Sequence, residues 1–236
     1  MKSWVPAALL VSAALTLAGC AGHIGAEDPS SSQTSQQTTP LTFSITTTTP
    51  TDTIATPTSK AYIGPNGLPM ETGAFLAPAT TTRLGAIVRG IQCEPFAQLA
   101  YASYVHLQVY VDGHSRALPG GIGIVDENPI ETQHGLYYGA LTCMYWLHTR
   151  AADGLVEAQA PVARRFTLGD LFAVWNQPLT RRRVAGAHGR VTVLVNGRRW
   201  RASPASIPLT EHAAIQLDVG TPAPAAQPVD WVGTNF

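Results

Sequence analysis

The chain has 236 residues, which is enough for one domain with a hydrophobic core plus extensions. Its 15 basic and 15 acidic residues cancel, so the overall charge does not favour nucleic acid as a partner. Charged residues make up only 13% of the chain, and Thr, Ser, Gly, Pro and Ala take their place. This composition is typical of a secreted protein rather than a cytosolic one.

The N-terminus predicts export. Met1 and Lys2 give a short positive start, and residues 4–17 form an apolar run too short to span a bilayer comfortably as a helix. The run ends in Leu-Ala-Gly-Cys20, which resembles the lipobox of bacterial lipoproteins. The resemblance implies that residues 1–19 are a cleaved signal peptide and that Cys20 carries diacylglycerol and an acylated amino group. An ordinary signal peptide or an uncleaved anchor is the alternative.

The predicted anchor places the protein in the cell envelope, where its partner is a membrane. Ala21 follows the cysteine. In Gram-negative lipoproteins an Asp at this position resembles an inner-membrane retention signal. If the host is Gram-negative, its absence favours the outer membrane, with the protein facing the periplasm or the surface.

Two further cysteines remain, Cys93 and Cys143. In an oxidising compartment we predict that they form a disulfide, closing a loop of about 50 residues. Two buried thiols or a redox pair are the alternatives, but no C-x-x-C spacing supports redox chemistry.

Composition divides the rest of the chain. Residues 20–60 are Ser/Thr/Gln/Pro tracts with almost no apolar content, which predicts a disordered tether. Residues 61–83 mix Pro and Gly with scattered apolar residues and predict an irregular arm packed on the domain. Residues 84–220 form the predicted β-rich domain, and residues 221–236 a Pro-rich tail whose Trp231 and Phe236 dock back on the surface.

Alternation predicts the first strand of the domain. Asp112-Gly113 follows it as a hairpin turn signal, and a second strand is expected into residues 122–124. One face of the first strand carries Val105, Leu107, Val109 and Val111, and the other carries Tyr104, His106, Gln108 and Tyr110. A further aromatic-rich strand is expected over residues 136–149, and residues 151–154 form a predicted turn before the segment LVEAQAP.

Two helices are predicted. Residues 94–101 suggest a short one with Pro95 in its first turn. The second begins at Thr167, where Thr167 and Asp170 resemble a capping box. Its apolar face carries Leu168, Leu171, Phe172 and Trp175.

The end of the domain repeats the plan of its start, with VTVLVNGRRW resembling VHLQVYVDGHSR. Each has an alternating strand, a turn ending in Gly and a short second strand, and a last strand is expected over residues 214–219. We therefore predict an α+β, mostly β fold, a small antiparallel sandwich-like domain with one packed helix.

Seven stretches carry a wider resemblance: GIQCEPFAQLAY, VHLQVYVDG, LPGGIGI, CMYWLHTRAADGLVE, FTLGDLFAVWNQPLT, VLVNG and IPLTEHAAIQLDVG. Together they resemble a family of uncharacterised secreted bacterial proteins. In these relatives the first strand is His-rich where this chain has Ala102, Tyr104 and His106. Their His-Thr-His-Asp turn corresponds to His148-Thr149-Arg150-Ala151, and a further His corresponds to Glu157. Metal binding is what those histidines imply.

This chain keeps only His106 and His148 of that set, and Arg150 puts a permanent cation in place of a ligand. Two histidines are too few for a closed zinc site, although His134 or Glu157 would be further ligands. We therefore expect no cofactor beyond the lipid. The alternatives are a copper or zinc site at His106 and His148, hydrogen-bonded strand-edge histidines, and a polar cleft that needs no metal.

No motif predicts an enzyme. There is no G-x-S-x-G elbow, and Asp126, Glu127 and Glu131 fall in an apparent loop rather than in a carboxylate pair. LPGGIG lacks the Lys and the helix of a phosphate-binding loop.

Arginine clusters between residues 164 and 201, with Asp170 the one acid. The nine are Arg164, Arg165, Arg181, Arg182, Arg183, Arg190, Arg198, Arg199 and Arg201. They predict contact with an anionic envelope component such as phospholipid, lipopolysaccharide or a wall polymer. The alternative is a solvated face balanced in space by the acids at 126–131.

The leading hypothesis is a lipid-anchored envelope protein with a non-catalytic binding or structural domain. A metal-binding protein and an unrecognised hydrolase are the others.

Overall fold

The structure, a computed structural model, describes residues 62–234 and residue 236. The predicted signal peptide, Cys20 and the tether lie outside these residues. One α-helix is described, α1 (Leu168–Val174), with two 3-10 turns, η1 (Ala79–Thr81) and η2 (Pro204–Ser206). The strands are β1 (Cys93–Glu94), β2 (Tyr101–Val111), β3 (His114–Arg116), β4 (Ile124–Thr132), β5 (Gly135–Tyr145), β6 (Leu147–His148), β7 (Leu155–Ala160), β8 (Leu179–Thr180), β9 (Arg183–Val184), β10 (Ala187–His188), β11 (Val191–Val195), β12 (Arg198–Arg199) and β13 (Ala214–Val219).

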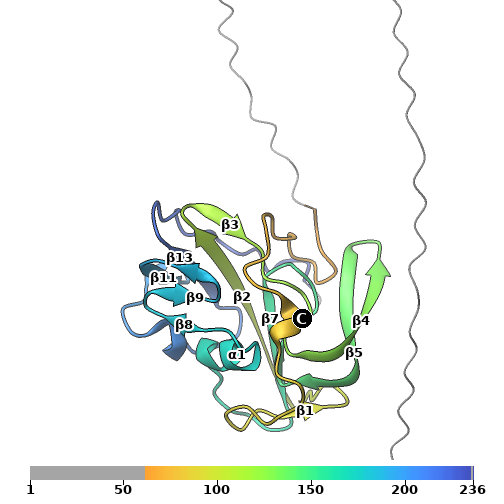
Figure 1. Ribbon diagram of the computed structural model, residues 1–236. Coiled ribbons are helices and arrows are strands. Elements are labelled where there is room, and N and C mark those ends of the chain that lie inside the picture. Colours follow the sequence, from red (N-terminus) through yellow and green to blue (C-terminus); the bar gives the residue numbers. More distant parts are fainter. Residues whose placement is uncertain (1–61, 235) are drawn as a thin grey trace, which may run out of the picture. The chain divides into compact units, whose positions relative to one another are not determined.

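The main sheet is built around β2. Its strand order is β12-β11-β13-β2-β7-β6, and β3 also pairs with β2. One edge of β2 pairs with β13 in parallel, and the other pairs antiparallel with β7 and then with β3. Figure 1 shows β2 crossing the middle of the domain, with β11 and β13 to its left.

The alternation in β2 gives the main sheet one apolar and one polar face. Val105, Leu107 and Val109 are fully buried and belong to the hydrophobic core, together with Leu171 and Phe172 of helix α1. The opposite face carries polar side chains from β2, β6, β7 and β13 in register, because paired residues point to the same side. The helix therefore covers the apolar face, and the polar face is free to form sites.

Two smaller sheets complete the domain. The β4–β5 hairpin pairs with β1, and Figure 1 shows it at the right, away from β11 and β13. The other small sheet has the order β10-β9-β8. The mostly β fold with one packed helix is confirmed. One pairing, β2 with β13, is parallel rather than antiparallel, because residues 200–213 carry the chain back across the sheet before β13.

Local chemistry explains several of these elements. The Asp170 carboxylate accepts hydrogen bonds from the Thr167 backbone N–H (3.0 Å) and hydroxyl (2.9 Å), which confirms the start of α1. Asp112 and Asn196 both have positive φ and precede a Gly with positive φ, as the two hairpin turns require. The two hairpins, β2–β3 and β11–β12, are therefore the repeat seen in the sequence.

Two predicted elements were wrong. Residues 94–101 form no helix: Cys93–Glu94 is strand β1, paired with β5. Phe96 and Leu99 are 80% and 68% exposed, so the segment has no apolar face to pack as a helix. The strand expected over residues 122–124 begins only at Ile124, because residues 120–123 form a turn in which Gly121 and Gly123 have positive φ.

The arm and the tail both lie on the polar face. Leu68 of the arm is fully buried, and the Glu71 backbone N–H donates to the Ala152 carbonyl. In the tail, the Gln227 backbone N–H donates to the Gln216 side chain of β13 at 3.0 Å. These two irregular segments bury polar side chains that the sheet alone would leave in water. In the described part of the chain, no helix has the length and apolar character needed to cross a membrane.

Candidate binding sites

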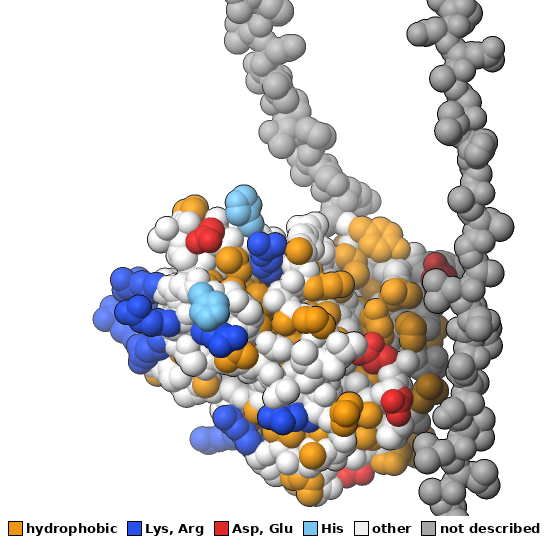
Figure 2. Space-filling model, in the orientation of Figure 1, with side chains coloured by type: hydrophobic (Ala, Val, Ile, Leu, Met, Phe, Trp, Pro, Cys, Tyr) orange, Lys and Arg blue, Asp and Glu red, His pale blue; other side chains and the backbone are white. Residues whose placement is uncertain are grey.

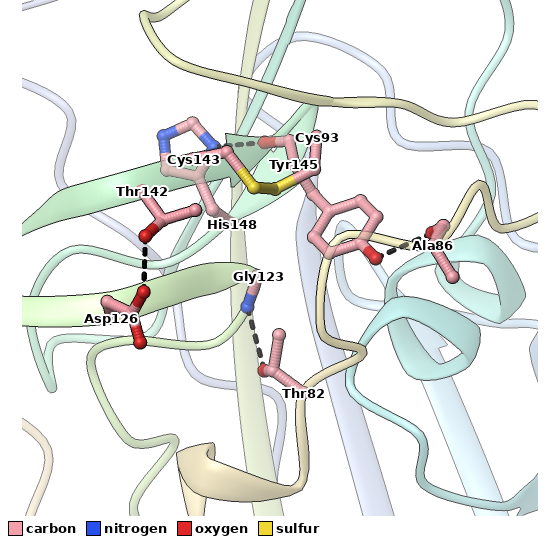
Figure 3. The surroundings of a disulfide bond; sticks show 9 residues. All are labelled: Thr82, Ala86, Cys93, Gly123, Asp126, Thr142, Cys143, Tyr145 and His148. Atoms are coloured by element: carbon pink, nitrogen blue, oxygen red, sulfur yellow. Dashed lines mark hydrogen bonds between the residues drawn. A yellow bond between two sulfur atoms is a disulfide. The ribbon is translucent and has the colours of Figure 1, made fainter. Parts of the chain in front are cut away.

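The disulfide joins β1 to β5. Cys93 and Cys143 are bonded with their Cα atoms 5.4 Å apart, so the predicted pairing is confirmed. Figure 3 shows the bond beside Tyr145, whose hydroxyl donates to the Ala86 carbonyl at 2.6 Å. These contacts hold residues 84–94 against the β4–β5 hairpin.

His106 lies in a tightly packed part of the polar face. Gly154 has φ +75°, and a Cβ there would lie 2.8 Å from His106 Nε2 and 3.0 Å from Glu71 Oε1. Burial lowers the pKa of His106 to about 4, against a hydrogen bond to the Asp153 backbone that raises it. This histidine is therefore a neutral, packed residue near neutral pH.

Glu71 and Asp153 are two carboxyls buried beside His106. Burial raises the pKa of Glu71 to about 8, although the Leu118 backbone N–H donates to Oε2. Burial also raises the pKa of Asp153 to about 6, opposed by hydrogen bonds from Leu155 and Asn66. The Asn66–Asp153 bond and Glu71 together attach the arm to the turn before β7.

His148 lies in a second polar cluster, around Glu157. Tyr104, Glu157 and His148 pair across β2, β7 and β6, so they share the polar face. Figure 3 shows His148 Nδ1 directed at the Tyr145 carbonyl, 2.8 Å away. His148 Nε2 faces Glu157 Oε2 at 3.5 Å, and Arg150 Nε lies 3.5 Å from the same oxygen.

Glu157 is the centre of this second cluster. Gln159 Nε2 donates to Glu157 Oε2 at 2.8 Å. Burial alone would raise the pKa of Glu157, but its contacts with His148 and then Arg150 hold it below the ordinary value. The buried carboxylate is therefore ionised and electrostatically matched by Arg150.

The two histidines of the metal hypothesis thus have separate partners: the Asp153 backbone and Gly154 for His106, and Tyr145 and Glu157 for His148. Over residues 62–234 and 236, no group of three or more His, Cys, Asp or Glu side chains is arranged to hold a metal ion. The orientation of His148 is that of a metal ligand held by its other nitrogen. Arg150, however, places a cation at the neighbouring position, and the metal site stays a prediction.

Arginines from two neighbouring hairpins line one groove of about 600 Å³. Arg181 and Arg182 come from the β8–β9 turn and Arg190 from the loop before β11, while Arg199 and Arg201 come from β12 and the segment after it. Trp200 lies between the last two, and its indole N–H donates to the Ser203 carbonyl at 3.1 Å.

Backbone hydrogen bonds hold the groove together. The Arg181 carbonyl accepts from the Val191 N–H, and the Arg182 carbonyl accepts from the Gly189 N–H, both at 3.0 Å. The Arg190 carbonyl accepts from Gly220 at the end of β13. The backbone of Arg181 and Arg190 is therefore tied to the main sheet or its end, and that of Arg182 to the loop before β11, although the three side chains are exposed.

The remaining arginines of the predicted cluster lie elsewhere. Arg164 donates to the Gly90 carbonyl at 2.9 Å and packs over the Phe166 ring, and Arg165 lines a different pocket with it. Arg183 donates to the Ala185 carbonyl at 2.9 Å. Arg198 is exposed on β12 and does not line the groove.

Acidic residues do not balance the groove. Among the described residues, none of its five arginines forms an ion pair. The acids at 126–131 lie on β4, in the separate hairpin. In Figure 2, Lys and Arg side chains gather at the left, where Figure 1 places β9 and β11, while acidic side chains lie mostly at the right.

Some residues of the buried polar clusters gave no signal in the sequence. Glu71 lies in the irregular arm, and Asp153 and Gln159 looked like ordinary turn and strand residues. Gln159 lies two residues after Glu157 on β7, so the two side chains point to the same face of the sheet. The face of Gln159 therefore follows from that of Glu157. Glu71 depends on how the arm folds back, which no periodicity reveals.

Comparison with protein-family models, with curated proteins and with solved structures finds no match. The resemblance to a family of secreted bacterial proteins therefore stays a prediction, and the function has to be argued from the geometry.

Proposed function

We propose that this chain is a lipid-anchored protein of the cell envelope whose β-rich domain binds a phosphate-bearing, anionic envelope component without catalysing a reaction. The single observation that carries this proposal is the groove lined by five arginines without an ion-pair partner among the described residues. The lipobox-like sequence before Cys20 supports the anchor.

Arginine chemistry favours phosphate as the recognised group. A guanidinium is always charged and presents paired N–H donors that match phosphate oxygens. Five like charges around one groove repel one another, so a bound anion would relieve that repulsion. The tied backbone of the β8–β9 and β10–β11 turns supports a groove that is formed before the ligand arrives.

Neutralising two groove arginines is expected to weaken anion binding roughly tenfold or more, since each charge-assisted hydrogen bond to phosphate is lost. The variant is Arg182→Gln with Arg199→Gln. The control, Arg83→Gln with Arg165→Gln, removes the same charge from exposed positions outside the groove.

The measurement is binding of the purified protein to inorganic polyphosphate and to phosphatidylglycerol vesicles, with phosphatidylcholine vesicles as the blank. Binding to polyphosphate alone would indicate a wall or surface polymer, and binding to the vesicles alone a lipid headgroup. Equal affinities for the groove variant and its control would contradict the proposal.

Replacing the predicted lipid attachment site is expected to release the protein from membranes. Cys20→Ser removes the thiol that takes the lipid, so the protein should move from the membrane pellet to the soluble fraction. Metabolic labelling with palmitate should label the wild type and not the variant. Cys93→Ser is the control, because it removes a cysteine of the domain's disulfide and leaves the predicted attachment site at Cys20 unchanged. Label retained by Cys20→Ser would refute the anchor.

A further inference from the structure

A second pocket, of about 520 Å³, opens on the polar face of the main sheet. Its volume lies within the range of small-molecule sites. It shares no lining residue with the arginine groove. The side chains that give it chemistry are Tyr104, Tyr137, Arg150, Glu157, Gln159 and Phe236.

Among the described residues, one buried polar atom at this pocket, Gln159 Oε1, has no hydrogen-bond partner, and two others have only a long contact with Glu157. Arg150 Nε and His148 Nε2 each lie 3.5 Å from Glu157 Oε2 without forming a hydrogen bond to it. An unpaired buried polar atom is costly, so each such atom requires an explanation. Arg150 offers a donor and Gln159 an acceptor, so the pocket calls for a ligand with both functions.

The charges of the pocket nearly cancel. Arg150 is the cation and Glu157 the carboxylate, and they face each other at 3.5 Å. Such a pair gives no strong preference for an anion, in contrast to the arginine groove. The Arg150 side chain also disfavours a metal cation.

Aromatic rings form the walls. Phe236 stacks on Tyr104 with ring centroids 4.3 Å apart, and the Arg150 guanidinium lies 5.5 Å from the centre of the Tyr137 ring. Aromatic side chains supply large apolar contact area, and each tyrosine also carries a hydroxyl. A ring with C–H groups on its face and hydroxyls at its edge fits these walls.

We propose that this pocket binds a saccharide unit. Each sugar hydroxyl is both a donor and an acceptor, so neighbouring hydroxyls can satisfy Gln159 Oε1 and Arg150 together. The C–H face of the ring packs on Tyr137 or on the stacked Tyr104 and Phe236. This site is independent of the arginine groove and does not rest on it.

The test is a glycan array of neutral and acidic mono- to tetrasaccharides, probed with the full chain purified in detergent. The strongest binder is then titrated by calorimetry. Gln159→Leu removes the unpaired acceptor, and Tyr137→Leu removes a wall. Each is expected to weaken binding roughly tenfold or more, because a polar partner or an aromatic contact is lost.

Matched controls keep the test specific. Gln108→Leu and Tyr110→Leu make the same changes on the same face of the sheet, outside the pocket. They are expected to leave the affinity within about twofold, as is Arg182→Gln with Arg199→Gln in the groove. The proposal is overturned if no glycan binds above the blank, or if the controls lose as much affinity as the pocket variants.

Discussion

Replacing Cys93 and Cys143 together by alanine is expected to lower the free energy of unfolding by about 4 kcal/mol, since the disulfide closes a loop of some fifty residues. The local structure makes the loss large. Strand β1 has only two residues paired with β5, and Leu84 and Phe96 beside it are exposed. Without the bond, the buried Ile91 and hydrogen bonds such as Tyr145 to Ala86 still hold residues 86–92, but residues 95–100 include no buried residue.

The measurement is thermal unfolding followed by circular dichroism. For a domain of this size the melting temperature should fall by about 10 °C. Reductant provides the matched control: it should lower the melting temperature of the wild type to that of the variant and leave the variant unchanged. A variant that melts within about 2 °C of the wild type would show that the bond adds little stability.

Replacing Glu71 by glutamine is expected to stabilise the domain at alkaline pH. Burial raises the pKa of this carboxyl to about 8, from 4.5. The folded state therefore holds the proton more tightly than the unfolded chain, and stability falls as pH rises from about 4.5 to 8. A glutamine at this position would remain neutral, and its side-chain oxygen can still accept the hydrogen bond from Leu118.

Neighbouring groups define the pH window for this test. The raised pKa of Asp153, about 6, costs stability as pH rises from 3.8 to 6. The lowered pKa of His106, about 4, costs stability as pH falls from 6.5 to 4. Above pH 6.5 both of these contributions are nearly constant, so the change between pH 6.5 and 8.5 isolates Glu71.

Melting temperatures at pH 6.5 and 8.5 test this expectation. The melting temperature of the wild type should fall by roughly 5 °C over this interval, because ionisation of Glu71 lowers the free energy of unfolding by about 2 kcal/mol. The melting temperature of Glu71→Gln should fall much less. Glu131→Gln, which removes an exposed carboxyl on β4, should behave like the wild type. The same decline in Glu71→Gln would mean that its carboxyl is not the titrating group.

Local sequence patterns correctly predicted several strands, turns and the helix. Strict alternation placed β2, and His106 and Tyr104 with it, on the polar face. The capping box placed α1, and the Gly-containing turns placed both hairpins. These elements depend on residues close in sequence, so the sequence contains most of the information that they need.

Long-range contacts were not predictable in the same way. Glu94 and Pro95 suggested a helix start, but pairing with β5 and the disulfide make Cys93–Glu94 a strand. The sequence suggested that the clustered arginines form one surface patch, yet the Arg164 and Arg183 side chains donate hydrogen bonds to backbone carbonyls within the domain. Which arginines line the groove depends on how two hairpins pack, and the sequence pattern does not report that.

The proposed function depends on the binding of phosphate-bearing anions in the five-arginine groove. Its most direct test is a calorimetric titration of the wild type with inorganic polyphosphate at about 20 mM and about 200 mM salt, beside Arg182→Gln with Arg199→Gln. We predict clear binding by the wild type at low salt, at least roughly tenfold weaker at high salt and in the groove variant. No binding at low salt, or an affinity that neither salt nor the variant changes, would contradict the claim.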